Sequence, residues 1–395
     1  MPKFLRKILF SLAFLLVLGV FSSFFVPAEF VYIRIFAHLK LNEFETMMSP
    51  RVYRLMADGN SLELDENAFN FRFKLQNDSI VISQGNKNLG TYAYVKFYTE
   101  DPLNEFKIKL ILPERKIRTY QGNISATVVD GGIRLVNEIL LDNYIAGVTE
   151  AEAGSRSSLE FYKVQAILAR TFALAHINKH AEEGFSLCDQ VHCQAYFGKP
   201  RELRIFSAIE ATKNKVVVDE NLNLIVAAFH SNSGGQTANS EDVWGSKTTY
   251  LRSVNDSFSI AMPNARWERK MLTEDWLSYL KLKHNYPVDD PGAKEAALNF
   301  RQDDRKIFLE GNEFKVPLKG VRQDLQLKST FFSIRPLSRD SIIFTGKGYG
   351  HGLGMCQEGA MCMGKRGYSY EQILNFYYQN IMLIDLHKLS FFKDE

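Results

Sequence analysis

The sequence has little net charge and lacks a long run of like charges. Its 48 lysine and arginine residues face 45 aspartate and glutamate residues, which leaves a formal net charge of +3. A nucleic-acid partner usually calls for a strongly basic surface, so the composition gives no support for one. With 46% hydrophobic and 24% charged residues, the chain also lacks the composition of a disordered protein. Its 395 residues suffice for two domains, or for one domain with insertions.

The first 30 residues are of a different kind. Lys3, Arg6 and Lys7 make a positive start, and residues 8–26 are a nearly unbroken apolar run without charge. Such a pattern is typical of a signal peptide or of an N-terminal membrane anchor, and both alternatives stay open. In either case we expect the rest of the chain to be exported to the cell envelope, the periplasm or the medium.

Residues 31–148 read as β-rich. Apolar and polar residues alternate over several short runs, and turn residues separate the runs. Asp130-Gly131 is a strong signal for a hairpin. Residues 31–105 carry little chemistry and form a β-rich lead-in region. The strands predicted in the whole region are 69–75, 79–83, 92–98, 106–112, 117–120, 125–129 and 132–136.

Residues 144–174 are the stretch around which the rest is organised. The apolar run 144–148 predicts the end of a strand, and Glu150 and Glu152 follow it. A helix then begins after Ser157 or Ser158, with apolar residues three or four apart on one buried face. The two carboxylates would thus lie in a loop between rigid elements, where catalytic side chains are common. A solvated glutamate that favours the helix dipole is the simpler alternative.

Two cysteines and a histidine follow this helix within six positions. Cys188, His192 and Cys193, with His180 upstream, form a candidate tetrahedral zinc cluster, although the spacing matches no standard zinc finger. A Cys188–Cys193 disulfide suits an exported protein, and free thiols are the third alternative. In each case we expect a structural role, which is to hold a loop beside a cleft.

Two later segments carry polar side chains around glycines. Residues 229–245 read FHSNSGGQTANSEDVWG, and their hydroxyl, carboxylate and aromatic groups are materials for holding a sugar. Residues 346–360 read GKGYGHGLGMCQEGA, in which alternating glycines leave one face of an extended chain bare. The second segment lacks the Lys-Ser/Thr ending of a phosphate loop. A glycine strand that serves packing alone remains an alternative.

The remaining elements are less marked. We expect residues 255–345 to form an inserted subdomain without a catalytic role, and residues 381–395 to be a C-terminal tail. The pattern predicts helices at 205–214, 273–280 and 370–378, a hairpin of 215–219 with 225–229, a strand at 267–270, and a loop at 286–293.

Three segments together resemble the SpoIID/LytB family. Tyr144, Gly147, Val148 and Glu152 match its Y-x-x-G-V-x-x-x-E pattern, and the helix that follows matches K-x-Q-A-x-x-A-R-T from Lys163 to Thr171. Residues 229–245 and 346–360 match its other two motifs, and the resemblance covers about residues 106–380. Residues 325–331 resemble the family's strand before the last motif, so the resemblance predicts a strand there. Ala153-Gly154 stands where the family usually has Met-Pro, and Glu358 where it often has Tyr.

The resemblance implies an α+β fold and an exported peptidoglycan lytic transglycosylase. Such an enzyme cleaves the glycan strand between N-acetylmuramic acid and N-acetylglucosamine with one glutamate as general acid and base, here Glu152. It needs no catalytic cofactor. The alternative is a glycan-binding enhancer of a cell-wall amidase, which would then be a partner. The residues that the resemblance places at the substrate are Arg170, Ser231, Ser233, Glu241, Trp244, His351 and Gln357.

Overall fold

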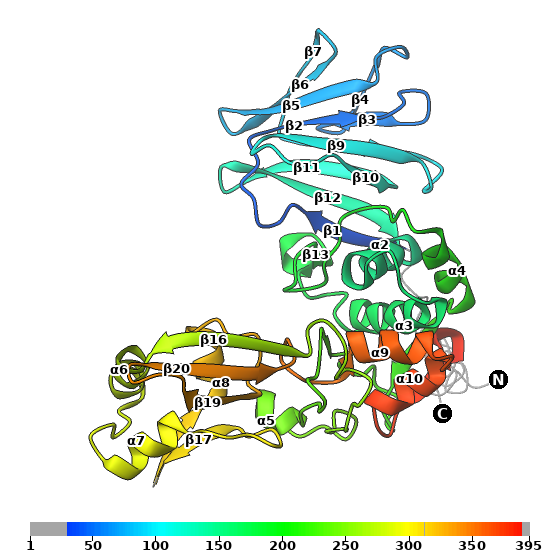
Figure 1. Cartoon of the computed structure of the whole chain (residues 1–395). Helices are drawn as coiled ribbons and strands as arrows, with labels where there is room; N and C mark the ends of the chain where they lie inside the picture. Colours follow the sequence, from blue (N-terminus) through cyan, green and yellow to red (C-terminus); the bar gives the residue numbers. More distant parts are fainter. Residues whose placement is uncertain (1–29, 312, 389–395) are drawn as a thin grey trace, which may run out of the picture.

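The computed structural model describes residues 30–311 and 313–388. Residues 1–29, and with them nearly all of the predicted export or anchor segment, lie outside the described residues. Within the described ranges no helix combines the length and the apolar character needed to cross a membrane. The fold is α+β, as predicted: two stacked sheets, a middle layer of helices, and a smaller sheet with helices of its own (Figure 1).

The two large sheets lie at one end of the molecule (Figure 1). The first, in spatial order, contains β13 (Leu187–Cys188), β1 (Phe30–Ile35), β12 (Gly132–Leu140), β11 (Asn123–Val129), β8 (Tyr94–Tyr98), β3 (Arg54–Ala57) and β4 (Asn60–Leu62). The second contains β10 (Arg118–Gln121), β9 (Glu105–Leu112), β2 (Glu43–Met47), β5 (Asn70–Gln76), β6 (Ser79–Gln84) and β7 (Lys87–Tyr92).

Alternating side chains build the core between these sheets. In β5, Phe71 and Phe73 are buried while their neighbours are exposed. The Phe73 ring stacks on Phe44 of β2 at 4.6 Å and meets Phe97 of β8 edge-on at 5.9 Å, so rings from both sheets share one core. The seven strands predicted in this region are confirmed as β5, β6 and β8 to β12, with boundaries that differ by at most four residues, whereas β1 to β4 and β7 were not predicted.

The predicted hairpin at Asp130-Gly131 is also confirmed. Val129 of β11 pairs with Gly132 of β12, and the two residues between them have φ values of 53° and 65°. Positive φ at both positions is what a two-residue turn between twisted strands requires.

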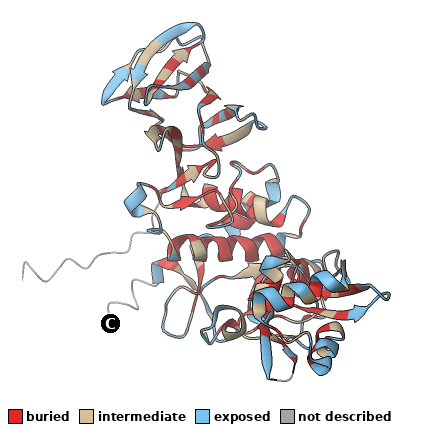
Figure 2. Cartoon of the chain, turned by 90° about the vertical axis from the view of Figure 1, so that its left-hand side faces the viewer, coloured by how far each residue is buried: buried red, intermediate tan, exposed pale blue. Residues whose placement is uncertain are grey.

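Three helices form the middle layer: α2 (Leu141–Ala153), α3 (Leu159–Ala175) and α4 (Leu203–Ala211). The predicted start of α3 is confirmed, because the Ser158 hydroxyl accepts a hydrogen bond from the Phe161 N–H at 3.3 Å. Twelve of the 17 residues of α3 are buried, and Figure 2 shows buried residues along the helices at the middle of the molecule. This layer is the rigid support for the residues discussed below.

Residues 144–148 are helical, which corrects the prediction of a strand end. β12 ends at Leu140 and α2 begins at the next residue. Residues 144–149 are all buried, so this segment lacks the one-sided pattern that distinguishes an amphipathic helix from a buried strand. As a consequence Glu150 and Glu152 lie in the last turn of a helix and not in a loop.

The C-terminal part returns to the helical layer. β14 (Lys215–Val218) is a strand as predicted, and its partner strand is β22 (Met382–Asp385). The predicted hairpin is present only in part, as an antiparallel bridge between Val218 and Leu224 and a hydrogen bond from the Ile225 N–H to the Val217 carbonyl oxygen at 3.2 Å. β15 (Phe229–His230) pairs in parallel with β21 (Met355–Cys356). The predicted helix at 370–378 is confirmed as α10. The other elements here are a 3-10 helix (Ala181–Glu183), α5 (Ser240–Trp244), α9 (Gln357–Lys365) and α10 (Tyr370–Tyr377).

A second hydrophobic cluster lies within residues 267–344. A three-stranded sheet carries it: β16 (Arg266–Leu272), β20 (Ser341–Lys347) and β19 (Phe332–Pro336). Around this sheet lie β17 (Phe308–Gly311), β18 (Phe314–Pro317), α6 (Thr273–His284), α7 (Pro291–Leu298) and α8 (Leu318–Asp324).

Two predictions in this region need correction. Residues 286–293 are not all loop, because Asp290 caps the N-terminus of α7, which begins at Pro291. The strand predicted at 325–331 is absent from the described residues, since β19 begins at Phe332. The predicted strand at 267–270 and helix at 273–280 are confirmed as β16 and α6.

Candidate functional site

The two carboxylates at the end of α2 have different surroundings. Glu150 Oε1 accepts hydrogen bonds from the backbone N–H groups of Arg201 at 2.8 Å and Glu202 at 2.9 Å. These N–H groups lie at the start of α4, where backbone donors lack partners within the helix. Glu150 therefore fixes α4 against α2, a structural role.

Glu152 is half-buried and makes a single side-chain hydrogen bond, from the Ala195 N–H to Oε1 at 3.1 Å. Among the described residues no lysine, arginine or histidine lies within ion-pair distance of it. Burial raises the pKa of Glu152 above the usual value for a glutamate, and the Ala195 hydrogen bond opposes this only in part. A carboxyl group of this kind holds its proton more readily than a solvated one, which suits a general acid.

Gln357 lies directly beside Glu152. From the first position of α9, its Nε2 donates to the carbonyl oxygen of Glu152 at 3.3 Å and to Oε1 of Gln165 at 3.5 Å. Gln165 is fully buried, and its own Nε2 has no hydrogen-bond partner in the described structure. The sequence placed Gln165 in a matched motif but not among the site residues. The structure thus joins the first and last motifs at the end of α2.

A groove of about 1120 Å³ runs beside this end of α2. Glu150, Gly154 and Ser155 line it on the helix side, whereas Glu152 is not among its lining residues. Its other walls carry several cations and exposed aromatic surface. They include Arg115, Lys116, Arg118, Phe197, Lys199, Arg201 and Phe206. Such a groove has room for a chain of sugar rings.

Arg170 is placed differently from what the resemblance implied. Its side chain is 1% exposed and pairs with Asp142 at 2.9 Å. The same guanidinium donates to the carbonyl oxygens of Thr212 at 2.9 Å and Lys215 at 3.2 Å. It is not an ion-pair partner of Glu152. These contacts join α2, α3 and β14, and a group so buried does not reach a substrate at the surface.

The polar loop 229–245 is held by side-chain contacts to residues 252–259. Ser233 is fully buried, and its hydroxyl bonds Asp256 and Ser259 at 2.8 Å each. Glu241 forms a two-pronged ion pair with Arg252, both bonds at 2.7 Å, which lowers the pKa of Glu241 to about 2. Both groups therefore support the loop.

The other two candidates of this loop remain accessible. Ser231 is half-buried, and its hydroxyl accepts a hydrogen bond from the Asn264 side chain at 3.4 Å. Trp244, at the end of α5, is 43% exposed, so its ring is open to a ligand.

His351 contacts both His230 and Trp244. The ring centroids are 5.6 Å and 6.1 Å apart, and the Leu353 N–H donates to His351 Nδ1 at 3.0 Å. Burial lowers the pKa of His351 to about 4, with the nearby Arg322 adding to the effect, so the imidazole is neutral at pH 7. At neutral pH His351 therefore offers an uncharged ring surface and does not act as a general acid.

Apart from Gly346, which lies in β20, the alternating glycines are not in an extended strand, which corrects a second expectation. Gly348, Gly350, Gly352 and Gly354 have φ values of 76°, 118°, 89° and 62°. The expected close approach is nevertheless present. A Cβ at Gly348 would lie 2.5 Å from the carbonyl oxygen of Asn232, and one at Gly354 would clash with that of Ala228. Glycine is needed because both the backbone angles and the contact exclude a side chain.

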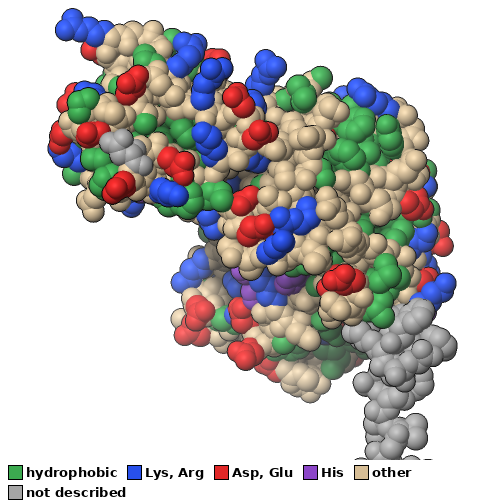
Figure 3. Space-filling model, turned by 90° about the horizontal axis from the view of Figure 1, so that it is seen from below, with side chains coloured by type: hydrophobic (Ala, Val, Ile, Leu, Met, Phe, Trp, Pro, Cys, Tyr) green, Lys and Arg blue, Asp and Glu red, His purple; other side chains and the backbone are tan. Residues whose placement is uncertain are grey.

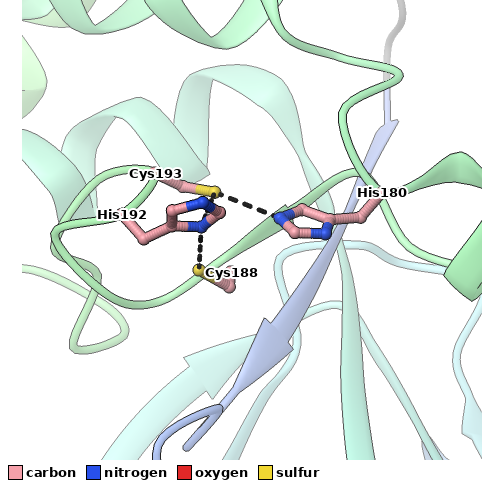
Figure 4. A group of neighbouring side chains, drawn as sticks. All are labelled: His180, Cys188, His192 and Cys193. Atoms are coloured by element: carbon pink, nitrogen blue, oxygen red, sulfur yellow. Dashed lines mark hydrogen bonds between the residues drawn. The ribbon is translucent and has the colours of Figure 1, made fainter.

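The four predicted metal ligands converge (Figure 4). Their donor atoms all lie within 4.8 Å of one another. Cys193 Sγ is 3.6 Å from His180 Nε2 and 3.8 Å from His192 Nδ1, and Cys188 Sγ is 3.9 Å from His192 Nδ1. In a tetrahedral zinc site with bonds of about 2.0–2.3 Å, the edges between ligands measure roughly 3.3–3.8 Å. Two thiols and two imidazoles in this arrangement fit zinc.

The surroundings of the cluster support the same fit. His180 Nδ1 lies 2.6 Å from the Glu183 carboxylate, and carboxylates commonly orient metal-binding histidines in this way. The hydrogen bond that Cys188 receives from Cys193 lowers the pKa of Cys188, whereas the neighbouring thiolate raises that of Cys193. A cation would relieve that repulsion. Both cysteines have free thiols in the structure.

Comparisons with known proteins agree with the motifs. The model of the SpoIID family, described as stage II sporulation protein, matches residues 129–218. A protein of Brachyspira hyodysenteriae is 29% identical over 284 residues, which is 69% of this chain and 74% of that protein. Stage II sporulation protein D of Bacillus subtilis is 28% identical over 63% of this chain and 75% of its own length. The amidase enhancer of Bacillus subtilis is 29% identical over 60% of this chain, but over 40% of its own length. With the motifs on α2–α3, on the 229–245 loop and on the glycine segment (residues 346–360), these matches support a relationship of the chain to the SpoIID/LytB family.

Proposed function

We propose that the protein is a peptidoglycan lytic transglycosylase in which Glu152 is the general acid and base. The observation that carries the proposal is the state of Glu152: half-buried, without an ion-pair partner among the described residues, and with a raised pKa. Glu150 is the nearest carboxylate in the sequence, and its Oε1 is committed to two backbone N–H groups.

One carboxyl group suffices for this reaction. Glu152 first gives its proton to the glycosidic oxygen while the bond from C1 of N-acetylmuramic acid to that oxygen breaks. The resulting carboxylate then takes the proton of the 6-hydroxyl of the same sugar, whose oxygen bonds to C1. The products are a 1,6-anhydro end and a free hydroxyl on the next sugar, and Glu152 is protonated again. Hydrolysis would normally need a second carboxylate.

We also propose that His180, Cys188, His192 and Cys193 hold a structural zinc ion. The loop that they close continues to Ala195, whose N–H holds Glu152, so the cluster would fix the position of the acid. Metal analysis of the purified protein should find one zinc per chain, and four thiols should react after denaturation. A Cys188–Cys193 disulfide would instead leave two reactive thiols and no bound metal.

A second candidate function is enhancement of a cell-wall amidase by glycan binding. The observation in its favour is the relative named amidase enhancer, which matches 60% of this chain. The two functions share an exported location at the cell envelope, which the basic and apolar first 30 residues support. They differ in whether the protein alone cleaves glycan.

Mass spectrometry of glycan strands tests the choice. Strands with and without stem peptides are incubated with the protein and with its Glu152→Gln variant. Anhydro-muramic ends made by the intact protein alone would support a transglycosylase. Reducing ends would indicate a hydrolase and a second carboxylate. Absence of products on both substrates would favour the enhancer, which should then accelerate a purified amidase.

A further inference from the structure

Arg322 is a cation without an anion. It lies on α8 and is half-buried, and its Nε atom is enclosed by protein without a hydrogen-bond acceptor. Within the described ranges no carboxylate lies within 4.0 Å of its guanidinium, and no hydrogen bond from its side chain is seen. A buried N–H group without an acceptor is costly, so such a group usually binds something in the working protein.

The neighbours of Arg322 increase the positive charge. Arg305 is committed to the loop, with donations to the carbonyl oxygens of Gln236 at 2.6 Å and Ser233 at 2.7 Å. These carbonyls are neutral, so the charge of Arg305 stays uncompensated. The fields of Arg305 and Arg322 both lower the pKa of His351, together with its burial. Tyr349, 45% exposed, is the further neighbour of Arg322 on this side.

An unsatisfied acceptor lies behind the same histidine. His230 is 4% exposed, and its Nδ1 bonds the carbonyl oxygen of Leu353 at 3.0 Å, so Nδ1 carries the proton and Nε2 is an acceptor. Nε2 is buried without a partner in the described structure. The Nε donor of Arg322, which has no acceptor, and the Nε2 acceptor of His230, which has no donor, thus both lie near His351.

Trp244 completes the group. Its half-exposed ring lies 6.1 Å from the ring of His351. Lys319 of α8 donates to the carbonyl oxygen of Val243 at 3.1 Å, which places α8, and with it Arg322, against α5. Figure 3 shows histidine side chains beside lysine or arginine side chains in a hollow on this face of the molecule.

We propose that Arg322 and Trp244 form a subsite for an anionic sugar, with the sugar ring against Trp244 and its acidic group against Arg322. Aromatic rings bind the apolar faces of sugars, and a guanidinium binds a carboxylate or a phosphate through paired hydrogen bonds. The inference rests on the proposed function for the identity of the sugar: N-acetylmuramic acid carries a carboxylate on its lactyl group, whereas N-acetylglucosamine carries none.

Binding of single sugars tests the subsite. The probes are N-acetylmuramic acid, N-acetylglucosamine and N-acetylglucosamine 6-phosphate, titrated into the full-length protein and followed by NMR. None has a glycosidic bond to another sugar, so a failure of the transglycosylase proposal would leave these results unchanged. We expect N-acetylmuramic acid to bind at least about tenfold more tightly than N-acetylglucosamine, a difference of about 1.4 kcal/mol.

Variants assign the preference to Arg322. Arg322→Gln should reduce the preference for N-acetylmuramic acid to nearly one, and Arg322→Lys should keep part of it. Arg335→Gln is the matched control, because it removes one positive charge from an exposed position on β19. Trp244→Ala should weaken both sugars together.

Three outcomes overturn the proposal. Equal affinity of the wild-type protein for all three sugars would exclude an anionic subsite even if the variants failed to fold. A preference that survives Arg322→Gln would place the recognition elsewhere. If N-acetylglucosamine 6-phosphate binds and N-acetylmuramic acid does not, the subsite recognises a phosphate group, and its assignment to the muramic carboxylate is wrong.

Discussion

The end of α2 and the glycine segment are opposites in charge. At the end of α2, Glu152 is an acid with no cation beside it among the described residues. Along the glycine segment, Arg305 and Arg322 are cations without carboxylate partners in the same part of the structure, and they surround neutral histidines. Elsewhere the protein pairs such groups, as Arg170 with Asp142 and Arg252 with Glu241.

This difference indicates which charged residues are available for catalysis or for binding a ligand. A carboxyl group that keeps its proton suits proton transfer to a leaving oxygen, whereas a cation that keeps its charge suits the binding of an anion. Groups that are already paired, such as Arg170 and Glu241, serve the fold. The following predictions test the contrast between the two regions, from the largest expected effect to the smallest.

The largest effect should come from Glu152→Gln. Loss of the general acid and base should lower the rate of anhydro-end formation by roughly a thousandfold, or about 4 kcal/mol in the barrier. Glu150→Gln is the matched control at the other carboxylate of the same helix turn. It should keep most of the activity, because Glu150 caps α4. Equal loss in both variants would show that the two carboxylates act together. The rate of anhydro-end formation, measured by mass spectrometry for both variants, distinguishes these outcomes.

The second effect concerns the packing of the glycine segment. Gly354→Ala should lower the free energy of unfolding by about 3 kcal/mol, because the new Cβ meets the carbonyl oxygen of Ala228 at a positive φ. Gly245→Ala is the control, since Gly245 also has a positive φ but nothing within 4 Å of a Cβ. It should cost about 1 kcal/mol. Urea unfolding of both variants measures the difference, and similar losses would mean that backbone angle alone explains the glycines.

A third prediction concerns acid. The folded-state pKa of His351 is lowered to about 4, and that of His230 is lowered as well, by burial first of all. Because the unfolded chain binds these protons more readily, stability is full above about pH 6.5 and is lost as the pH falls towards 4. Thermal unfolding between pH 4 and 7 should show this loss, and His351→Gln should reduce it. An unchanged slope in the variant would contradict the assignment.

The smallest effect should appear at the end of α2, with the opposite sign. The folded-state pKa of Glu152 is raised by burial, so its contribution to stability is full below the usual glutamate pKa of about 4.3 and is lost as the pH rises. Glu152→Gln should therefore unfold at a slightly higher temperature than the wild type at pH 7, and at a similar one at pH 4. A variant less stable at pH 7 would show that the carboxylate holds the loop at Ala195.

Local patterns determined much of the fold. Alternation predicted seven of the 13 strands of the stacked sheets, Asp130-Gly131 predicted a hairpin between two of them, and Ser158 predicted the start of α3. These features depend on neighbours in the chain, so a single sequence contains them. The pairing of β14 with β22 cannot be predicted from neighbours in the chain, because the two strands are more than 160 residues apart and either strand could pair with a segment closer in sequence.

The candidate site divides in the same way. The sequence by itself determined which residue types are available: two glutamates at the end of one segment, two cysteines with two histidines, and glycines that admit close contact. The tertiary structure alone decided which of them are committed. In the folded chain the backbone at the start of α4 donates hydrogen bonds to Glu150, whereas Glu152 accepts a hydrogen bond from a single N–H group. Arg170 is buried in an ion pair with Asp142, and the Nε atom of Arg322 has no hydrogen-bond acceptor in the described structure. Whether a side chain is held in a hydrogen bond or an ion pair depends on partners distant in the chain, and only folding brings those partners together.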